Sequence, residues 1–297
     1  MHRDLTFYTG TDEYSLEEQE LLALEAELDD EGIAELDFRE LTLDYDSYSL
    51  SDPDFSDLEF DDYSDIDAPD LVLDVPYVPT DERVVRMMLD FANVSAKDTL
   101  YDLGCGDGRI VVAAAIERNA RAIGIDMDPM RIAEAMEYAG NVGVEHQVDF
   151  IEGDLLEVDF SEASVVTLYL LDHVNVLLRP RLLNELRPGT RIVSHAFDMG
   201  DWKPDKRMNY GGANLFKWIV PAKVDKLQEW QTQSGDTCRV ELQQKYQKLT
   251  GKAWINGEKA LLKSALLKGD LLELIVQKDA KSQPESLLIR CKNASTV

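Results

Sequence analysis

A glycine-rich segment, YDLGCGDGRI (Tyr101–Ile110), constrains this chain more than any other stretch. An apolar run leads into Asp102, glycines follow at alternate positions, and an alanine-rich apolar segment runs from Arg109 to about Glu117. This pattern predicts a strand, a tight turn and a helix. Glycine permits positive φ and lets a ligand approach the backbone, and the first turn of a helix offers free N–H groups. The segment therefore indicates a binding site for a polar small molecule.

The acid that ends the predicted strand indicates the charge of that molecule. A carboxylate at Asp102 would repel a pyrophosphate and attract a cationic amine. This favours S-adenosylmethionine, which carries an ammonium and a sulfonium, over NAD. A dinucleotide-binding G-x-G-x-x-G pattern would also need glycine at position 109, where the chain has Arg109. An NAD-dependent oxidoreductase is therefore the weaker alternative.

Charge divides the chain into unequal parts. Residues 1–70 hold 25 Asp and Glu against 2 Lys and Arg, a net charge of −23, whereas the whole chain carries −28. We interpret residues 1–70 as an acidic, disordered arm with one possible helix at Leu16–Gly32, because self-repulsion opposes collapse. The alternative is an arm whose aromatic residues bind a partner. Residues 71–213 form the predicted cofactor-binding core, and residues 214–297 complete its sheet and add a β appendage.

Composition also argues against several classes of protein. No window approaches the roughly 18 apolar residues of a membrane span, and the N-terminus lacks the apolar core of a secretory signal. The three cysteines are far apart and the four histidines lack metal-ligand spacing, so we expect neither a disulfide framework nor a metal site. Basic residues of the C-terminal third alternate with apolar ones, as on a solvated sheet face, so we expect no nucleic-acid partner. These features predict a soluble, cytoplasmic protein.

Predicted strands and helices alternate after residue 71. The strands are Thr99–Leu103, Arg121–Asp126, Gln147–Glu152, Val165–Leu171 and Thr190–His195. The helices begin with one for which Thr80 is the expected N-cap, and continue with residues 108–118, 129–141 and 174–186. This order is typical of a doubly wound α/β fold, a mostly parallel sheet with helices on both faces.

The alternation of predicted strands and helices ends near residue 198. Residues 198–213 are predicted as a loop, and the apolar or alternating runs that follow predict antiparallel strands, with an Asn256-Gly257 hairpin turn. These strands are Leu215–Val220, Cys238–Tyr246, Ala253–Ile255, Leu271–Val276 and Leu287–Ile289. We expect the first one or two to complete the parallel sheet and the others to form the appendage.

Acidic residues follow three consecutive predicted strands. Asp102 ends the first, Asp126 ends the second, and Asp154 follows the third. Ligands of doubly wound sheets bind outside the carboxyl ends of the strands, so these side chains should line one crevice. Asp126 is placed to bind both ribose hydroxyls and Asp154 an adenine amino group, while Met127 and Leu155 would sandwich the adenine ring.

Several motifs resemble those of a known family. Residues 75–202 resemble the class I S-adenosylmethionine-dependent methyltransferases. Within them, YVPT (Tyr77–Thr80) followed by DLGCGDGRI (Asp102–Ile110) is similar to a bacterial group and to the eukaryotic lysine methyltransferases of the ATP synthase c-subunit. Further segments resemble the bacterial group: Tyr169–Asn175, Leu178–His195, Phe197–Trp202 and Trp218–Val224. The resemblance covers most of residues 72–297.

The resemblance implies roles for the loop residues. Asp102, Gly104 and Gly106 would hold the methionine end of the cofactor, and Tyr77 and Thr80 would close the pocket. Cys105 lies in the same loop, where the lysine enzymes usually have serine, and we expect it to line the site without acting as a nucleophile. The lysine enzymes usually have glutamate in place of Asp126, and the bacterial group tends to have proline in place of Asp172.

The segment after the fourth strand lies beside the transferred methyl group in this fold. Tyr169, Asp172, His173 and Asn175 are therefore the candidate catalytic residues, which would help an amine lose its proton. Asp172 and Asn175 are equally well explained as caps of the following helix. His195 is expected at the same edge, with a structural role the more common one for such a residue.

Together these features predict a methyltransferase that acts by in-line displacement on an unidentified acceptor. The resemblance points to a protein side chain such as lysine. The alternative from another class is a binding protein that keeps the cofactor fold without turnover.

Overall fold

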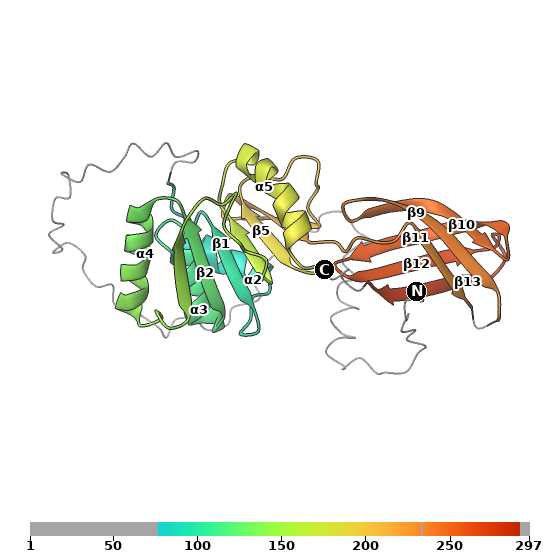
Figure 1. Cartoon of the computed structure of the whole chain (residues 1–297), viewed down its shortest axis with the longest axis horizontal. Coiled ribbons are helices and arrows are strands. Elements are labelled where there is room, and N and C mark those ends of the chain that lie inside the picture. The colour runs from blue at the N-terminus through green and yellow to red at the C-terminus, as the bar shows by residue number, and fades with distance from the viewer. Residues whose placement is uncertain (1–76, 233, 292–297) are drawn as a thin grey trace. The chain divides into compact units, whose positions relative to one another are not determined.

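The computed structural model describes residues 77–232 and 234–291 (Figure 1). The predicted acidic arm of residues 1–70, with its possible helix at Leu16–Gly32, lies outside the described residues. Within the described part of the chain, no helix is long and apolar enough to cross a membrane.

A seven-stranded sheet has the strand order β3-β2-β1-β4-β5-β7-β6. Its first five members pair in parallel, and β7 and β6 join antiparallel at one edge. The strands are β1 (Thr99–Leu103), β2 (Arg121–Asp126), β3 (Val148–Glu152), β4 (Val165–Leu168), β5 (Arg191–His195), β6 (Lys206–Tyr210) and β7 (Ala213–Ile219). The doubly wound, mostly parallel sheet predicted from the sequence is thus confirmed.

Helices cover both faces of this sheet (Figure 1). They are α2 (Glu82–Phe91), α3 (Arg109–Arg118), α4 (Pro129–Val142) and α5 (Asp172–Glu185). Leu100 of β1 packs in a cluster with residues of α2, α3 and α4, whereas its neighbour Tyr101 packs in a second cluster with residues of α5. Successive strand residues point to opposite faces, so one strand supplies both cores.

The sheet order also determines where a ligand can bind. The chain builds outward from β1 to β3 on one side and returns to add β4 on the other side of β1. The carboxyl ends of β1 and β4 are therefore the point where the strand order reverses, which is where ligands bind in open α/β sheets. The β1–β4 register pairs Asp102 with Thr167 at this point.

Two helix starts differ from the predictions. The N-cap of α2 is Asp81, whose carboxylate accepts a hydrogen bond from the Arg83 N–H, so the prediction that Thr80 is the cap was wrong. Helix α5 begins at Asp172 after Leu171, which makes no side-chain cap. Neither Asp172 nor Asn175 is the cap of α5.

A six-stranded antiparallel sheet follows, in the order β13-β12-β11-β10-β9-β8 and without helices (Figure 1). Its strands are β8 (Leu227–Gln231), β9 (Thr237–Lys245), β10 (Lys248–Ile255), β11 (Glu258–Lys268), β12 (Leu271–Gln277) and β13 (Pro284–Arg290). The aliphatic side chains of one face form a third core cluster, which includes Val240, Leu272 and Leu274. The predicted β appendage is present.

The sequence prediction missed three strands. β6 lies within residues 198–213, which were wrongly predicted as a loop, and β8 and β11 were not predicted. Of the five residues of β6, Met208 is the one that is apolar and partly buried. The strand therefore shows little alternation of apolar and polar residues in the sequence. In β11 the register shifts between Leu262 and Ser264, so the inward-facing positions change parity within the strand.

Candidate functional site

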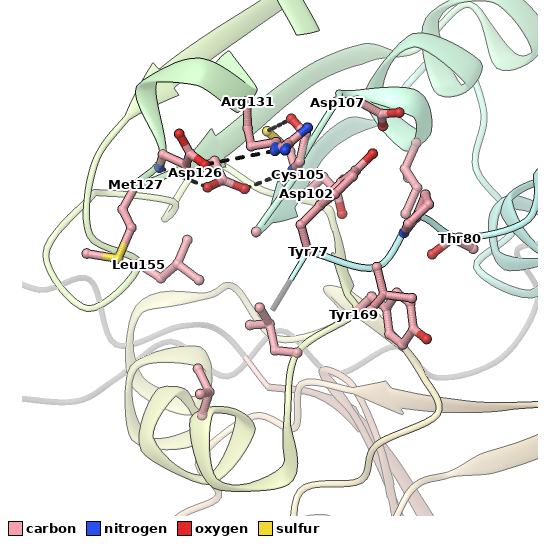
Figure 2. A pocket seen from close by; sticks show the side chains of 18 of the residues that line it. Tyr77, Thr80, Asp102, Cys105, Asp107, Asp126, Met127, Arg131, Leu155 and Tyr169 are labelled. Carbon is pink, nitrogen blue, oxygen red and sulfur yellow. Dashed lines mark hydrogen bonds and ion pairs between the residues drawn. The ribbon is translucent and has the colours of Figure 1, made fainter. Parts of the chain in front are cut away.

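A cavity lies at the carboxyl ends of the parallel strands (Figure 2). All ten residues predicted to bind the cofactor line it: Tyr77, Thr80, Asp102, Gly104, Cys105, Gly106, Asp126, Met127, Asp154 and Leu155. Figure 2 shows Met127 and Leu155 at one end of this space and Thr80 and Tyr169 at the other. The sheet therefore brings together side chains that are up to 100 positions apart in the sequence, Tyr77 and Leu177.

The glycine-rich loop has the backbone that its sequence predicts. Gly106 has a φ of +52°, and a Cβ there would lie 2.6 Å from the Tyr77 ring. Gly108 has a φ of +77° at the N-cap of α3, and a Cβ there would meet the Phe150 ring at 2.8 Å. A side chain at either position would thus be strained by its backbone and would collide with an aromatic ring. The loop can lie against its neighbours only with glycine at these positions.

Asp102 is the most deeply buried acid of the cavity. Asp102 is only 2% exposed, and the Thr167 hydroxyl donates a hydrogen bond of 2.7 Å to its Oδ1. Burial raises the pKa of Asp102 to about 7, with the nearby Asp126 carboxylate adding to this rise and the Thr167 hydrogen bond opposing it. A cation placed beside Asp102 would favour its ionised form. Near neutral pH, the ionisation of the Asp102 carboxyl group therefore depends on the charge of a bound ligand.

Asp126 joins the end of β2 to the glycine loop. Its Oδ2 accepts a hydrogen bond of 2.8 Å from the Gly106 N–H, and its Oδ1 accepts one of 3.0 Å from the Asp128 N–H. These bonds hold the carboxylate in one orientation at the wall of the cavity. Each carboxylate oxygen has a second lone pair, so the group can still accept hydrogen bonds from a diol.

Asp154 and two apolar side chains form the end of the cavity beyond Asp126. The Asp154 Oδ1 accepts a hydrogen bond of 2.7 Å from the Leu156 N–H, which fixes the turn after β3. Leu155 follows Asp154 in the chain, and Figure 2 shows it at the same end of the cavity as Met127. An apolar surface next to a carboxylate suits a flat heterocycle that carries an amino group.

A group of charged residues that the sequence analysis did not assign holds the segment before α2 in place. The Arg109 Nη1 donates to the Thr80 carbonyl at 2.8 Å, and its Nε donates to Asp107 at 2.9 Å. The guanidinium of Arg131 lies 4.1 Å above the Tyr77 ring. Burial would raise the pKa of Asp107, but the hydrogen bonds and charge of Arg109 keep it below its usual value. In the sequence Arg109 was notable only as the residue that breaks a dinucleotide-binding pattern.

Tyr169 lines the cavity at the end of β4 and is held between aromatic rings. Its ring centroid lies 3.9 Å from that of His195 and 6.3 Å from that of Phe197. The Thr80 hydroxyl lies 3.4 Å from the His195 Nδ1, and burial lowers the pKa of His195. His195 thus packs against Tyr169 and is not among the residues that line the cavity.

The three other catalytic candidates do not line the cavity. Asp172 is exposed and accepts a hydrogen bond of 3.1 Å from the Asp198 N–H. His173 is exposed. Asn175 is fully buried, and its Nδ2 donates to the carbonyls of Phe197 and Asp198 at 3.4 and 3.3 Å. Asp172 and Asn175 therefore anchor the segment after β5, which carries a ring that contacts Tyr169.

The carboxylates and apolar side chains that line the cavity fit S-adenosylmethionine better than a dinucleotide. Carboxylates of Asp102, Asp126 and Asp154 face one space, and a buried acid with a raised pKa favours a cationic ligand. A pyrophosphate placed there would meet these negative charges. The apolar end near Met127 and Leu155 can receive the adenine ring.

Comparison with known proteins agrees with this assignment. The family model described as ANTKMT methyltransferase domain matches residues 102–206. A protein-lysine N-methyltransferase of Saccharolobus islandicus (strain REY15A) is 47% identical over 142 residues, which cover 48% of this chain and 88% of that relative. The lysine N-methyltransferase of the ATP synthase c-subunit from Xenopus laevis is 32% identical over 157 residues, covering 52% of this chain and 69% of that relative.

Among solved structures, the chain is similar to an RNA methyltransferase from Salinibacter ruber in complex with S-adenosyl-L-homocysteine. The sequence identity is 49% and the TM-score 0.49, with coverage of 50% of this chain and 97% of that one.

The fold and the acidic cavity together define an S-adenosylmethionine-dependent methyltransferase. Within this class, the chain belongs to the family that contains the protein-lysine N-methyltransferase of Saccharolobus islandicus and the Xenopus laevis enzyme named for the ATP synthase c-subunit.

Proposed function

We propose that this methyltransferase transfers the methyl group to the side-chain amine of lysine in a protein. The observation that carries the proposal is a cavity lined with carboxylates in a chain that is 47% identical to a protein-lysine N-methyltransferase over 88% of that relative. We also propose a cytoplasmic location, since Cys105, Cys238 and Cys291 are free thiols, as expected in a reducing compartment.

We assign the cofactor-binding roles as the cavity suggests. Asp102 would pair with the ammonium group of the methionine end, and Asp126 would accept hydrogen bonds from the ribose hydroxyls. Asp154 would accept from the adenine amino group. When bound, S-adenosylmethionine supplies a methyl group on a sulfonium that a nucleophile can displace in line. The contribution of the protein is then chiefly to orient the two reactants and exclude water.

Tyr169 is the residue that we assign to the acceptor. It is the one member of the four catalytic candidates that lines the cavity, and its ring is held by its contacts with His195 and Phe197. Its hydroxyl can accept a hydrogen bond from the incoming amine and so direct the nitrogen lone pair. An amine must be neutral to attack, so its proton must leave to solvent before the transfer, and the oriented hydroxyl then fixes the direction of the lone pair.

The test is transfer of a tritiated methyl group from S-adenosylmethionine by the full-length protein to proteins of a cell extract. We expect label that is released by protease, resists nuclease and is found by mass spectrometry on lysine. An extract whose lysine amines have been acetylated should accept none. Label that nuclease removes, or that lies on another side chain, would overturn the lysine assignment. Cofactor binding without transfer to any component would favour a binding protein.

Tyr169→Phe separates the role of the hydroxyl from that of the ring. We expect this variant to bind the cofactor with unchanged affinity and to transfer at about a tenth to a hundredth of the original rate. Full activity of Tyr169→Phe would show that the hydroxyl is not needed.

A further inference from the structure

Exposed aliphatic side chains are among the residues that line the cavity. Val78, Leu156 and Leu177 all line the cavity, yet they are 54%, 44% and 59% exposed. They come from the segment before α2, the turn after β3, and α5. Single exposed apolar residues are ordinary, but several around one opening indicate a surface that binds something. We call these three residues the apolar rim.

The interior of the same cavity has the opposite character. Asp102, Asp126 and Asp154 line it, and each of the two arginines that also line it binds another residue of the protein. Arg109 binds Asp107 and the Thr80 carbonyl, and Arg131 binds Glu134 at 2.5 Å. A molecule that enters therefore meets aliphatic groups first and carboxylates afterwards. With the cofactor bound to these carboxylates, the acceptor meets the aliphatic groups, and the four methylenes of lysine are an apolar stem that suits them.

The rim extends beyond what one lysine stem can cover. The acceptor lysine belongs to a polypeptide, so the residues on either side of it must lie against the mouth while its amine reaches inward. Apolar neighbouring residues would bury the surface of Val78, Leu156 and Leu177 that the bound cofactor leaves exposed. Charged neighbours would lose solvation against the rim without a partner there.

We propose that the apolar rim binds aliphatic side chains that flank the methylated lysine. The acceptor class is thus a protein segment in which lysine lies among residues such as leucine and valine. This inference rests on the proposed lysine activity and narrows it to a kind of sequence.

The experiment compares matched peptides as acceptors for the full-length protein. One peptide has lysine flanked by leucine and valine, the second has serine at those positions, and the third has aspartate. We expect the KM of the leucine–valine peptide to be at least about tenfold lower than that of the serine peptide, because burial of one large aliphatic side chain changes an equilibrium by about that factor or more. The aspartate peptide should be the poorest acceptor.

Rim variants test whether the preference comes from these residues. At saturating cofactor, Leu177→Ser should raise the KM for the leucine–valine peptide about tenfold and leave that for the serine peptide nearly unchanged. The matched control is Ile116→Ser, since Ile116 is also 54% exposed but lies on α3 and does not line the cavity. The KM values of Ile116→Ser for both peptides should equal those of the unaltered protein.

Three outcomes would overturn the rim proposal. Equal KM values for the three peptides would remove the preference itself. Equal effects of Leu177→Ser and Ile116→Ser would show that the rim is not special. A lower melting temperature of Leu177→Ser with an unchanged KM would show that another part of this chain covers the rim. Failure of every lysine peptide, with the cofactor still bound, would instead overturn the lysine activity on which the proposal rests.

Discussion

The two sheets of this protein bury their side chains in different patterns. All four residues of β4 in the seven-stranded sheet are buried, whereas β12 in the six-stranded sheet alternates between buried and partly exposed residues. The first pattern arises because helices cover both faces of a parallel sheet, and the second because an antiparallel sheet buries one face. The strands therefore look different in the sequence, as a continuous apolar run or as an alternation.

The difference also explains where the cavity lies. Parallel strands all end at the same edge, and each is followed by a loop that leads to a helix, so several loops meet there. The cavity is lined by residues from four such strand ends, among them Asp102, Asp126, Asp154 and Tyr169. Antiparallel strands of the second sheet are joined by hairpins that lie alternately at its two ends. The first sheet therefore presents polar side chains at one edge, while the second uses its apolar side chains to form a core.

The two sheets should differ most in how cofactor affinity responds when one acidic residue of each sheet is replaced by alanine. Asp126→Ala is expected to weaken cofactor binding about 100-fold or more. It would lose two ribose hydrogen bonds to a charged acceptor, each worth about 1.5–3 kcal/mol, as well as the tether to the Gly106 N–H. Isothermal titration calorimetry with S-adenosylmethionine measures the change.

The matched variant in the six-stranded sheet is Glu241→Ala. Glu241 is a half-exposed acid that pairs with Arg239 at 3.2 Å, an interaction worth little at the surface. Its removal should leave the dissociation constant within about twofold of the original value. The cofactor affinity of Asp126→Asn should lie between those of Asp126→Ala and Glu241→Ala, because asparagine keeps one oxygen as a hydrogen-bond acceptor. An affinity of Asp126→Ala close to that of Glu241→Ala would contradict the assignment of Asp126 to the ribose.

Much of the cavity could be predicted because the signals of its lining residues are local in the sequence. Asp102 is the penultimate residue of β1 and Asp126 is the last residue of β2, and the glycines of the loop reveal a backbone that only glycine adopts easily. The rule that strand ends share one edge then brought the acids together. These inferences required no knowledge of which strands are neighbours.

The parts that could not be predicted depend on pairing between distant segments. Thr167 lies beside Asp102 because β1 pairs with β4 in one particular register, and no local pattern in either strand encodes that register. The contact of Arg131 with Tyr77 also joins α4 to a segment before α2. Asp172 and His173 were candidates by position after β4, but the helix α5 starts at Asp172 and turns both away from the cavity.

A smaller effect is expected from pH. The pKa of Asp102 is about 7 because of burial, and binding of an ammonium group favours the ionised carboxylate. Cofactor affinity should therefore rise about tenfold between pH 6 and pH 8, as the ionised fraction in the free protein rises. The raised pKa has the opposite consequence for the free protein, whose stability should fall as pH rises through 7. Titration calorimetry and thermal unfolding at several pH values measure the two trends.

Variants of Thr167 and Asp102 identify the group responsible. Thr167→Val removes the hydroxyl that donates to Asp102, so the midpoint of the affinity profile should move up by about one pH unit. Thr167→Ser keeps the donor and should keep the midpoint. Asp102→Asn cannot ionise, and we expect weak binding that hardly varies with pH. A profile that persists unchanged in Asp102→Asn would mean that another group titrates.

The smallest effect on cofactor binding should come from the core of the six-stranded sheet. Leu274 is fully buried in a cluster that shares no residue with the cavity, so Leu274→Ala should lower the free energy of unfolding by about 2–5 kcal/mol and change cofactor affinity less than twofold. Leu103→Ala, at an equally buried position next to Asp102, should lower both. Urea unfolding and calorimetry on the two variants provide the comparison. If Leu274→Ala weakened cofactor binding as much as Leu103→Ala, the six-stranded sheet would support the geometry of the site and not only its own fold.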